Sequence, residues 1–298
     1  MTKLVLIDGH AIMHRAYHAL PTSLTTRENE PINAVYGFTS MLLKVIQDLK
    51  PTHIAVCFDR KEPTFRKEMF EDYQSHRPET EKELVSQFSK AKDVAKAMAI
   101  PVFEMAGFEA DDLIGTIAEK AKVDEVNIVT GDRDILQLVN KKTKVYLPIG
   151  GLSNAVLMGE EEVVKKMKVR PSQIVDYKGF VGDPSDNYKG VPGVGPKTAE
   201  KLLDEYGTLE DVYKNLDKIP ETVANKLKEH KESALTSQKL AKIVRDVDIT
   251  FDVDKMASWQ VNSPKLLSLF ENYGFKTLTR RVKTLGDKIE EEKQGVLF

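Results

Sequence analysis

Cysteine is scarce in this sequence, and it has neither long apolar runs nor a large excess of either charge. Its 298 residues include one cysteine, Cys57, which excludes an internal disulfide and a cysteine-based zinc site. No segment approaches the roughly 20 apolar residues that a membrane helix needs. The apolar run at residues 4–7 is too short for a signal peptide. From these absences we expect a cytoplasmic protein that does not interact with membranes.

The charge is nearly balanced, with 44 basic and 46 acidic residues and a formal net charge of −2. Proteins that bind nucleic acids are often basic, so this value alone argues against such a partner. Nine of the acids, named below, are candidate ligands for cations, and setting aside their nine negative charges leaves +7 on the rest of the chain. A mildly basic surface around a cation-neutralised acidic pocket suits a phosphodiester substrate.

Three short runs of apolar, mainly β-branched residues each lead to aspartate. Unbroken runs of this kind are typical of parallel strands that are buried on both faces. With helical segments between them, they predict an α/β fold around a parallel sheet. The runs and their acids are residues 4–7 with Asp8, residues 54–58 with Asp59, and residues 126–129 with Asp132 and Asp134.

Helical periodicity fills the gaps between these runs and is the only pattern after about residue 170. One expected helix has the capping-box spacing of Thr80 and Glu83, and another follows a loop rich in glycine and proline at residues 182–196. We expect the last dozen residues, which are highly charged, to be mobile. The expected helices are residues 35–50, 80–99, 111–122, 197–206, 208–215, 220–231, 233–245, 263–273 and 277–285.

Two further acidic clusters lie near expected helix starts, at residues 109–112 and 183–186. Taken singly, each acid is readily explained as a turn or helix-capping residue. Ligands of parallel sheets bind beyond the carboxyl ends of the strands, so several acids would meet there and repel one another unless cations were bound. Mg²⁺ prefers such oxygen ligands, and two such ions can act on both oxygens of a phosphoryl displacement. The nine candidate ligands are Asp8, Asp59, Glu109, Asp111, Asp112, Asp132, Asp134, Asp183 and Asp186.

Recognisable motifs surround these acids and the glycine loop along nearly the whole chain. They are Leu6-Ile7-Asp8-Gly9 with Arg15-Ala16-Tyr17, Asn33-Ala34-Val35-Tyr36-Gly37-Phe38, Phe58-Asp59 with Thr64-Phe65-Arg66, Tyr73 with Arg77-Pro78, Glu109-Ala110-Asp111-Asp112, Val129-Thr130-Gly131-Asp132-Arg133-Asp134, Gly182-Asp183 with Ser185-Asp186-Asn187, and Gly190-Val191-Pro192-Gly193-Val194-Gly195-Pro196-Lys197-Thr198-Ala199. With these motifs the sequence resembles the 5′→3′ exonuclease domain of bacterial DNA polymerase I and, more broadly, the 5′ flap endonucleases.

The resemblance implies a PIN-like core with a helical arch over the active site, followed by a helix–three-turn–helix that holds duplex DNA. It also implies two Mg²⁺ ions, which Mn²⁺ can replace, and a K⁺ ion at the helix–three-turn–helix loop. We place the core at 1–170 with the arch at about 65–95, the duplex-binding region at 171–260, C-terminal helices at 261–288 and a flexible tail at 289–298. One metal would be held mainly by Asp8, Asp59, Glu109 and Asp111, the other mainly by Asp132, Asp134 and Asp183, with Asp112 and Asp186 nearby or acting through water.

Several other residues would contact DNA if the resemblance holds. Arg15, Tyr73 and Arg77 match positions that handle the 5′ end and the scissile phosphate, because arginine suits bidentate phosphate contact and an aromatic ring can stack on an unpaired base. From the residues alone, Tyr73 could also be a half-buried helix residue. A glycine loop at a helix N-terminus suits contacts to the DNA backbone. The expected DNA-binding residues are Arg66, Lys67, Lys189, Gly193, Gly195, Lys197 and Thr198.

Three positions depart from the family pattern. Gln74 stands where the family usually has a lysine that stabilises the scissile phosphate, so this role is missing, reduced, or taken by Lys67 or Arg77. Tyr188-Lys189 replaces the usual Ile-Pro, and Lys189 is a candidate for an additional phosphate contact. Pro184 is also unusual.

The sequence ends in Gln294-Gly295-Val296-Leu297-Phe298. This resembles the short peptides with which bacterial proteins bind the sliding clamp, since an extended peptide can dock two apolar anchors in a groove. Gln294, Leu297 and Phe298 are the expected contacts. A chance match, or a chain cut before a polymerase region, explains the same five residues.

The leading hypothesis is a monomeric, structure-specific 5′ nuclease that acts on DNA flaps, nicks and RNA-primer ends in replication and repair. A PIN-type ribonuclease is an alternative, but it predicts fewer acids and no duplex-binding glycine loop. A catalytically weakened DNA-binding paralogue is a second alternative, which Gln74 favours and the complete acid set disfavours.

Overall fold

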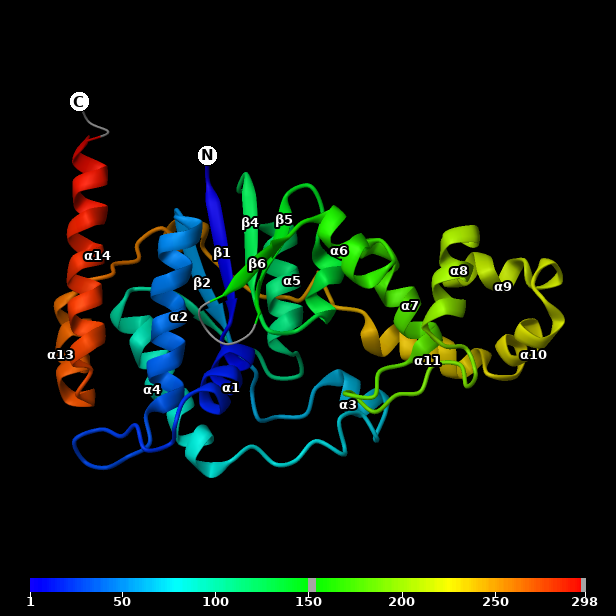
Figure 1. Ribbon diagram of the computed structural model, residues 1–298, viewed down its shortest axis with the longest axis horizontal. Helices are drawn as coiled ribbons and strands as arrows, with labels where there is room; N and C mark the ends of the chain where they lie inside the picture. The colour runs from blue at the N-terminus through cyan, green and yellow to red at the C-terminus, as the bar shows by residue number, and fades with distance from the viewer. Residues whose placement is uncertain (150–153, 296–298) are drawn as a thin grey trace.

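The computed structural model describes residues 1–149 and 154–295, which form a twisted six-stranded sheet with helices on both faces (Figure 1). The strand order is β3-β2-β1-β4-β5-β6. Strands β1 to β5 pair in parallel, and β6 pairs antiparallel with β5 at the edge. The strands are β1 (Lys3–Asp8), β2 (His53–Cys57), β3 (Val102–Phe103), β4 (Glu125–Val129), β5 (Thr143–Pro148) and β6 (Ala155–Met158).

Both faces of the sheet are covered, as the unbroken apolar runs predict. In β1, Leu4 and Leu6 belong to one hydrophobic core, whereas Val5 and Ile7 belong to the other. Successive side chains of a strand point to opposite faces, so one four-residue run contributes to two cores. The three predicted strands are confirmed as β1, β2 and β4, whereas the edge strands β3 and β6 and the interior strand β5 were not predicted.

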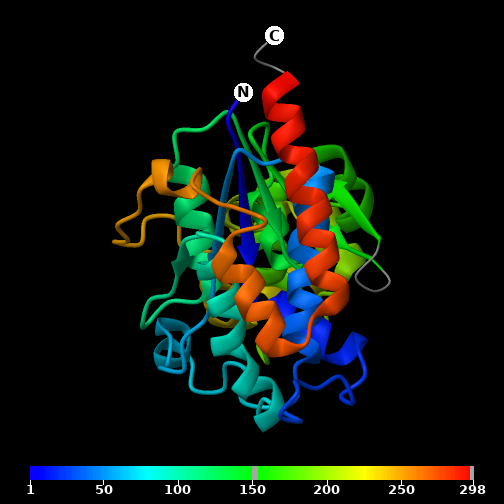
Figure 2. The same cartoon turned by 90° about the vertical axis from the view of Figure 1, so that its left-hand side faces the viewer.

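The helices separate by face. On one face lie α1 (Gly9–Ala19), α2 (Asn33–Leu49), α4 (Lys82–Ala97), α13 (Pro264–Tyr273) and α14 (Lys276–Gly295). On the other lie α5 (Ala110–Lys120), the 3₁₀ helix η1 (Asp134–Leu138), α6 (Glu160–Met167) and α7 (Ile174–Val181). Figure 2 shows α14 standing beside α2, with which it is in contact.

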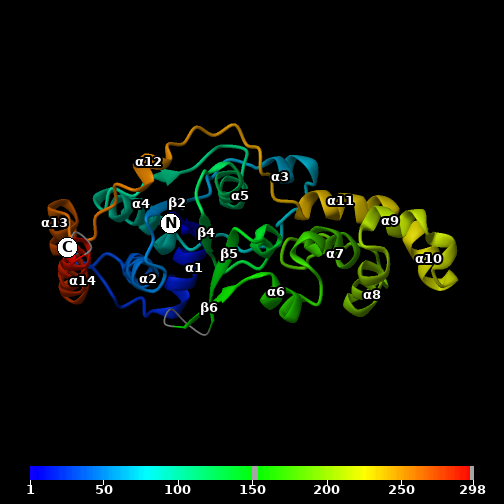
Figure 3. The same cartoon turned by 90° about the horizontal axis from the view of Figure 1, so that it is seen from above.

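The chain after residue 170 is mostly helical, and its residues 196–229 extend away from the sheet (Figure 1). From α11 the chain returns to the core through residues 240–247, which we call the return segment; Figure 3 shows it leaving α11 and passing α5 on its way to α12. The remaining elements are α3 (Phe65–Met69), η2 (Pro171–Gln173), α8 (Pro196–Tyr206), α9 (Leu209–Lys214), η3 (Leu216–Lys218), α10 (Glu221–Glu229), α11 (Lys231–Ala241) and α12 (Val253–Met256).

Two local predictions are wrong. The capping box of Thr80 and Glu83 is absent, because α4 starts one residue later, with Glu81 at the N-cap and no side-chain cap. The tail expected to be mobile from residue 289 is helical to Gly295. Ile289 packs against the core one turn beyond Leu285, and Glu292 pairs with Lys50 at 3.1 Å, so the helix continues. Within the described ranges, no helix has the length and apolar content to cross a membrane.

Candidate metal centre and nuclease site

The carboxyl edge of the sheet gathers acids from four separate segments. Asp8 ends β1, and its carboxylate caps α1 by accepting from the backbone N–H of Ala11 at 2.9 Å and also accepts from the Thr130 hydroxyl at 2.7 Å. Asp59 follows β2 and accepts from the N–H of Ala110 at 2.6 Å. Strands β2 and β3 lie on one side of β1, and β4 and the later strands lie on the other. Open α/β sheets bind their ligands at this change in strand order.

A first group of acids surrounds Asp8. Burial and the neighbouring charge of Asp59 together raise the pKa of Asp8 to about 7. Burial also raises the pKa of Asp111 well above its usual range, together with the charges of Asp8 and Asp132. Glu109 has a pKa of about 7, because burial outweighs the opposing effect of Arg66. Carboxylates that raise each other's pKa in this way are a favourable place for a divalent cation.

A second group consists of Asp134, Asp183 and Asp186, whose ligand oxygens lie within 4.8 Å of one another. Lys178 on α7 donates hydrogen bonds to both Asp134 and Asp183. Burial raises the pKa of Asp134 to about 7, as does the charge of Asp132. Burial acts in the same direction on Asp183, but Lys178 holds its pKa below the usual value. Lys178 was not predicted, although a lysine in a largely apolar helix was a signal.

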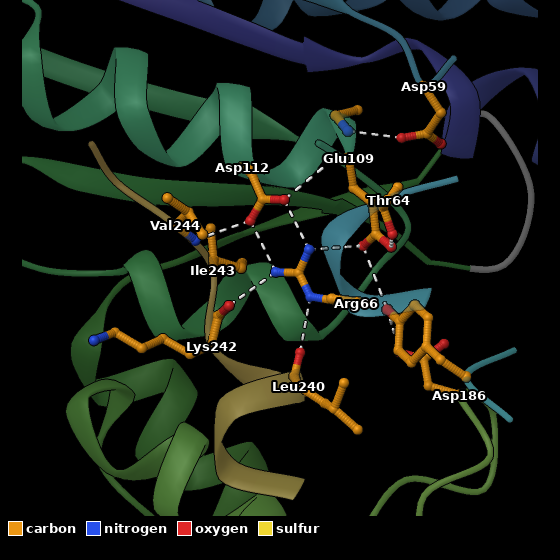
Figure 4. Close-up of polar contacts among 12 residues, drawn as sticks. Asp59, Thr64, Arg66, Glu109, Asp112, Asp186, Leu240, Lys242, Ile243 and Val244 are labelled. Atoms are coloured by element: carbon orange, nitrogen blue, oxygen red, sulfur yellow. Dashed lines mark hydrogen bonds and ion pairs between the residues drawn. The ribbon is translucent and has the colours of Figure 1, made fainter. Parts of the chain in front are cut away.

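Asp112 does not belong to either group, contrary to the prediction. It is fully buried, and its two oxygens accept hydrogen bonds from both terminal nitrogens of Arg66, at 2.7 and 2.8 Å. The same oxygens also accept from the backbone N–H groups of Glu109 and Val244. With four donors on two oxygens, no lone pair is left for a cation, so we remove Asp112 from the set of ligands (Figure 4).

Arg66 is also placed differently from the prediction. The residue is only 2% exposed, and its guanidinium faces α5 and the return segment. A side chain in this position cannot reach a DNA phosphate, so Arg66 is not a direct DNA contact.

The segment that follows α3 lies against the second acidic group. The Tyr73 hydroxyl donates to Glu109 at 3.4 Å and to Asp186 at 3.3 Å. The Gln74 amide and the Arg77 guanidinium donate to the other oxygen of Asp186, at 3.0 and 2.5 Å. Tyr73 is 4% exposed, so its ring is more deeply buried than a stacking role requires.

A cavity of about 1150 Å³ opens above the acids. Its lining combines the acids with several cationic side chains, whose charge can attract a polyanion. Arg15, half-buried on α1, is not among the described residues that line it. Apart from the buried Arg66, the cationic lining residues are Arg60, Lys61, Lys67, Arg77 and Lys92.

The glycine loop continues from the second acidic group to the start of α8. Gly182 and Gly190 have positive φ angles of 72° and 61°, and a Cβ on either would meet backbone atoms at 2.4 Å. They close a tight hairpin in which Asp183 and Tyr188 pair. Gly195 is the N-cap of α8. The predicted DNA-binding residues Lys189, Gly193, Gly195 and Lys197 are exposed here, and Thr198 is half-buried.

Comparison with known families tests this assignment. The model described as "5'-3' exonuclease, N-terminal resolvase-like domain" matches residues 3–168, and "5'-3' exonuclease, C-terminal SAM fold" matches residues 169–264. The chain belongs to the 5′-3′ exonuclease family. The α/β fold and the nuclease class predicted from the sequence are therefore confirmed.

Relatives of the 5′-3′ exonuclease family include two bacterial DNA polymerases I. The chain is 41% identical to that of Bacillus caldotenax over 294 residues and 39% identical to that of Bacillus subtilis over 295 residues, which is 98% of the chain in both cases. It spans 33% of the length of each polymerase.

Solved structures share the fold. A T5 5′-exonuclease with bound zinc has a TM-score of 0.67 at 20% identity and covers 95% of this chain and 98% of its own. The catalytic core of Rad2 in complex with DNA substrate has a TM-score of 0.59 at 18% identity, over 91% of this chain and 88% of that one.

Proposed function

We propose that this chain is a structure-specific 5′ nuclease that hydrolyses DNA at flaps, nicks and RNA-primer ends and leaves 5′-phosphates. The observation that supports it most strongly is the pair of acidic groups at the carboxyl edge of the sheet, at a cavity that cationic side chains also line. Family membership supports the same chemistry. A role in primer removal and repair follows from this substrate class.

The acids would hold two divalent cations, with Mg²⁺ as the expected ion and Mn²⁺ as a substitute. Asp8, Asp59, Glu109 and Asp111 would hold one ion, and Asp134, Asp183 and Asp186 the other. Asp132 lies between the groups, because its charge raises the pKa of Asp8, Asp111 and Asp134 alike. Two such ions supply a lowered pKa for a water and charge stabilisation for the departing oxygen. Divalent ions are bound in the T5 5′-exonuclease structure, which supports this assignment.

The protein's own residues would position the DNA. Arg77 and Lys67 line the cavity beside the acids, where they can contact the scissile phosphate. The exposed glycine loop and Lys197 at the N-terminus of α8 would hold the duplex through its backbone. Lys226 donates to the carbonyl of Gly193 at 3.1 Å and adds a cation there. A K⁺ ion at this loop is proposed from the family resemblance.

Cleavage of a 5′-flap duplex tests the proposal. With Mg²⁺ or Mn²⁺ we expect release of the flap from a 3′-labelled strand, retention of a 5′-phosphate on the remaining strand, and no reaction in EDTA. A structured RNA of the same shape serves as the comparison. Faster cleavage of the RNA would favour a PIN-type ribonuclease, binding without cleavage would favour the weakened paralogue, and activity in EDTA would exclude the metal mechanism.

We further propose that residues 294–298 bind a sliding clamp and that the protein acts as a monomer. Gln294 lies in the last turn of helix α14, which ends at Gly295, and Leu297 and Phe298 lie outside the described residues. Deleting 294–298 is expected to abolish binding to purified bacterial clamp in surface plasmon resonance and to leave cleavage of free flaps intact. Unchanged clamp binding would end this proposal.

A further inference from the structure

The guanidinium of Arg66 donates hydrogen bonds to two parts of the fold, the start of α5 and the return segment (Figure 4). Its Nε donates to the carbonyl of Leu240 at 2.9 Å, and one terminal nitrogen donates to the carbonyl of Lys242 at 2.8 Å. The two terminal nitrogens hold Asp112 in a bidentate pair, and one of them reaches Glu109 at 3.3 Å. A planar fork that uses its donors this fully fixes the relative position of its partners.

One of these partners is a candidate metal ligand. The carboxylate of Glu109 accepts from Arg66 at 3.3 Å, and also from the Thr64 hydroxyl at 3.3 Å and the Tyr73 hydroxyl at 3.4 Å. Asp112 adds a contact to the backbone N–H of Glu109 at 3.2 Å. The pair of Arg66 and Asp112 therefore orients Glu109 from both its side chain and its backbone.

The other partners belong to the return segment, which bonds to two of the elements that carry candidate ligands, α5 and η1. Its Val244 N–H donates to Asp112 on α5 at 2.8 Å. Gln137 on η1, the helix that begins with Asp134, donates to the carbonyl of Ala241 and accepts from the N–H of Ile243. The return segment thus connects α3, α5 and η1, and Arg66 forms the α3 part of that connection.

The return segment also leads to the duplex-binding candidate region. It continues α11, whose Ser233 and Ser237 hydroxyls bond to the carbonyl and the N–H of Gly190 in the glycine loop. A continuous set of hydrogen bonds and one rigid helix therefore runs from the glycine loop to Glu109, with Arg66 at its end.

We propose that Arg66 is a positioning residue that holds the metal ligand Glu109 in register with the helical region, rather than a DNA contact. The inference rests on the proposed metal-dependent nuclease activity. Partners of metal ligands typically change metal affinity by 10–100-fold when they are removed, and we expect an effect of this size. Because Arg66 does not reach the phosphates, its loss leaves the ionic-strength dependence of DNA binding unchanged.

The test compares Arg66→Lys, which keeps the charge but loses the fork, with Lys197→Met, a candidate phosphate contact. Mn²⁺ binding to the DNA-free full chain is measured by calorimetry, and binding to a 5′-flap duplex is measured in EDTA over a range of salt. For Arg66→Lys we expect a 10–100-fold weaker Mn²⁺ site and an unchanged salt slope. For Lys197→Met we expect unchanged Mn²⁺ binding and a salt slope smaller by about 1.

Three results have distinct meanings. A wild-type chain that binds no Mn²⁺ contradicts the proposed function itself. Normal Mn²⁺ binding by Arg66→Lys, or a salt slope reduced as in Lys197→Met, overturns the positioning role. Circular dichroism checks folding, and if Arg66→Lys does not fold, Asp112→Asn is measured in its place. Its amide has the shape of the carboxylate but turns a donor toward Arg66, and unchanged Mn²⁺ affinity in that variant likewise overturns the inference.

Discussion

Gln74 lies on the cavity wall with a left-handed backbone, φ 55°, and its amide donates to Asp186. The family resemblance leads us to expect a lysine here. A neutral amide thus occupies a place beside the second acidic group where a cation could contact a scissile phosphate. Arg77, which pairs with the same carboxylate at 2.5 Å, is the nearest replacement on the same segment.

Gln74→Lys is therefore expected to increase the single-turnover cleavage rate of a 5′-flap duplex by about tenfold, because an added cation stabilises charge that develops on the phosphate. Gln74→Met, which removes the amide without adding charge, is the matched control. Rapid-quench measurements at saturating enzyme separate this rate from DNA binding. Equal rates for Gln74→Lys and wild type would show that Arg77 or Lys67 already supplies the charge.

Asp132 lies close enough to both acidic groups for its charge to act on each. Its charge raises the pKa of acids in each, and its carboxylate accepts from the N–H of Asp134 at 2.8 Å. Asp132→Asn is expected to lower the cleavage rate by about 10²-fold or more. Binding of flap DNA should persist or become tighter, because a charge that repels phosphate is removed. Near-normal cleavage in a gel assay with Mg²⁺ would remove Asp132 from the ligand set.

At the scale of elements, the glycine loop combines two kinds of glycine. The fold requires glycine at positions 182 and 190, because each has a positive φ and lies against backbone atoms. Gly195 has open space where a Cβ would be, and it precedes the first turn of α8. Its lack of a side chain serves access to the helix N-terminus.

Alanine should therefore lower stability at one kind of position and weaken DNA binding at the other. Gly190→Ala is expected to destabilise the protein by about 3 kcal/mol, since the backbone is strained and the Cβ has no room. Gly195→Ala should keep the wild-type melting temperature but weaken binding to duplex DNA, because the methyl group holds phosphates away from the N–H groups. Thermal melts and fluorescence anisotropy distinguish the two. Full DNA affinity in a folded Gly195→Ala protein would contradict the assigned role of the loop.

At the scale of the whole molecule, the acids connect stability to pH and metal. Asp8, Glu109 and Asp134 have usual pKa values of 3.8 to 4.5 and folded values of about 7. Between these values the folded protein holds more protons than the unfolded chain, so raising the pH favours unfolding. The stability that the protonated forms of these acids contribute is fully present below about pH 4 and is lost as the pH rises through 7.

In EDTA the melting temperature is therefore expected to fall between pH 5 and pH 8. Mg²⁺ or Mn²⁺ should reverse most of that fall, because bound cations favour the deprotonated carboxylates and stabilise the folded state. Scanning calorimetry with and without metal checks both parts. A melting temperature that rises over this range in EDTA would show that other groups dominate the pH dependence.

The sequence alone determined the strands that carry the acids and most of the helices, because long periodic or unbroken apolar segments encode their own burial. It also determined the family, since motifs such as Glu109-Ala110-Asp111-Asp112 and the glycine loop are local in the chain. The tertiary structure decided which residues meet. In the sequence, Asp112 and Arg66 resemble site residues. In the fold the return segment, which is distant in the chain, packs against both: Leu240 and Lys242 bond to Arg66, and Val244 bonds to Asp112. Lys178 became part of the site for the same reason: contacts between distant segments depend on how the elements pack, which no local pattern contains.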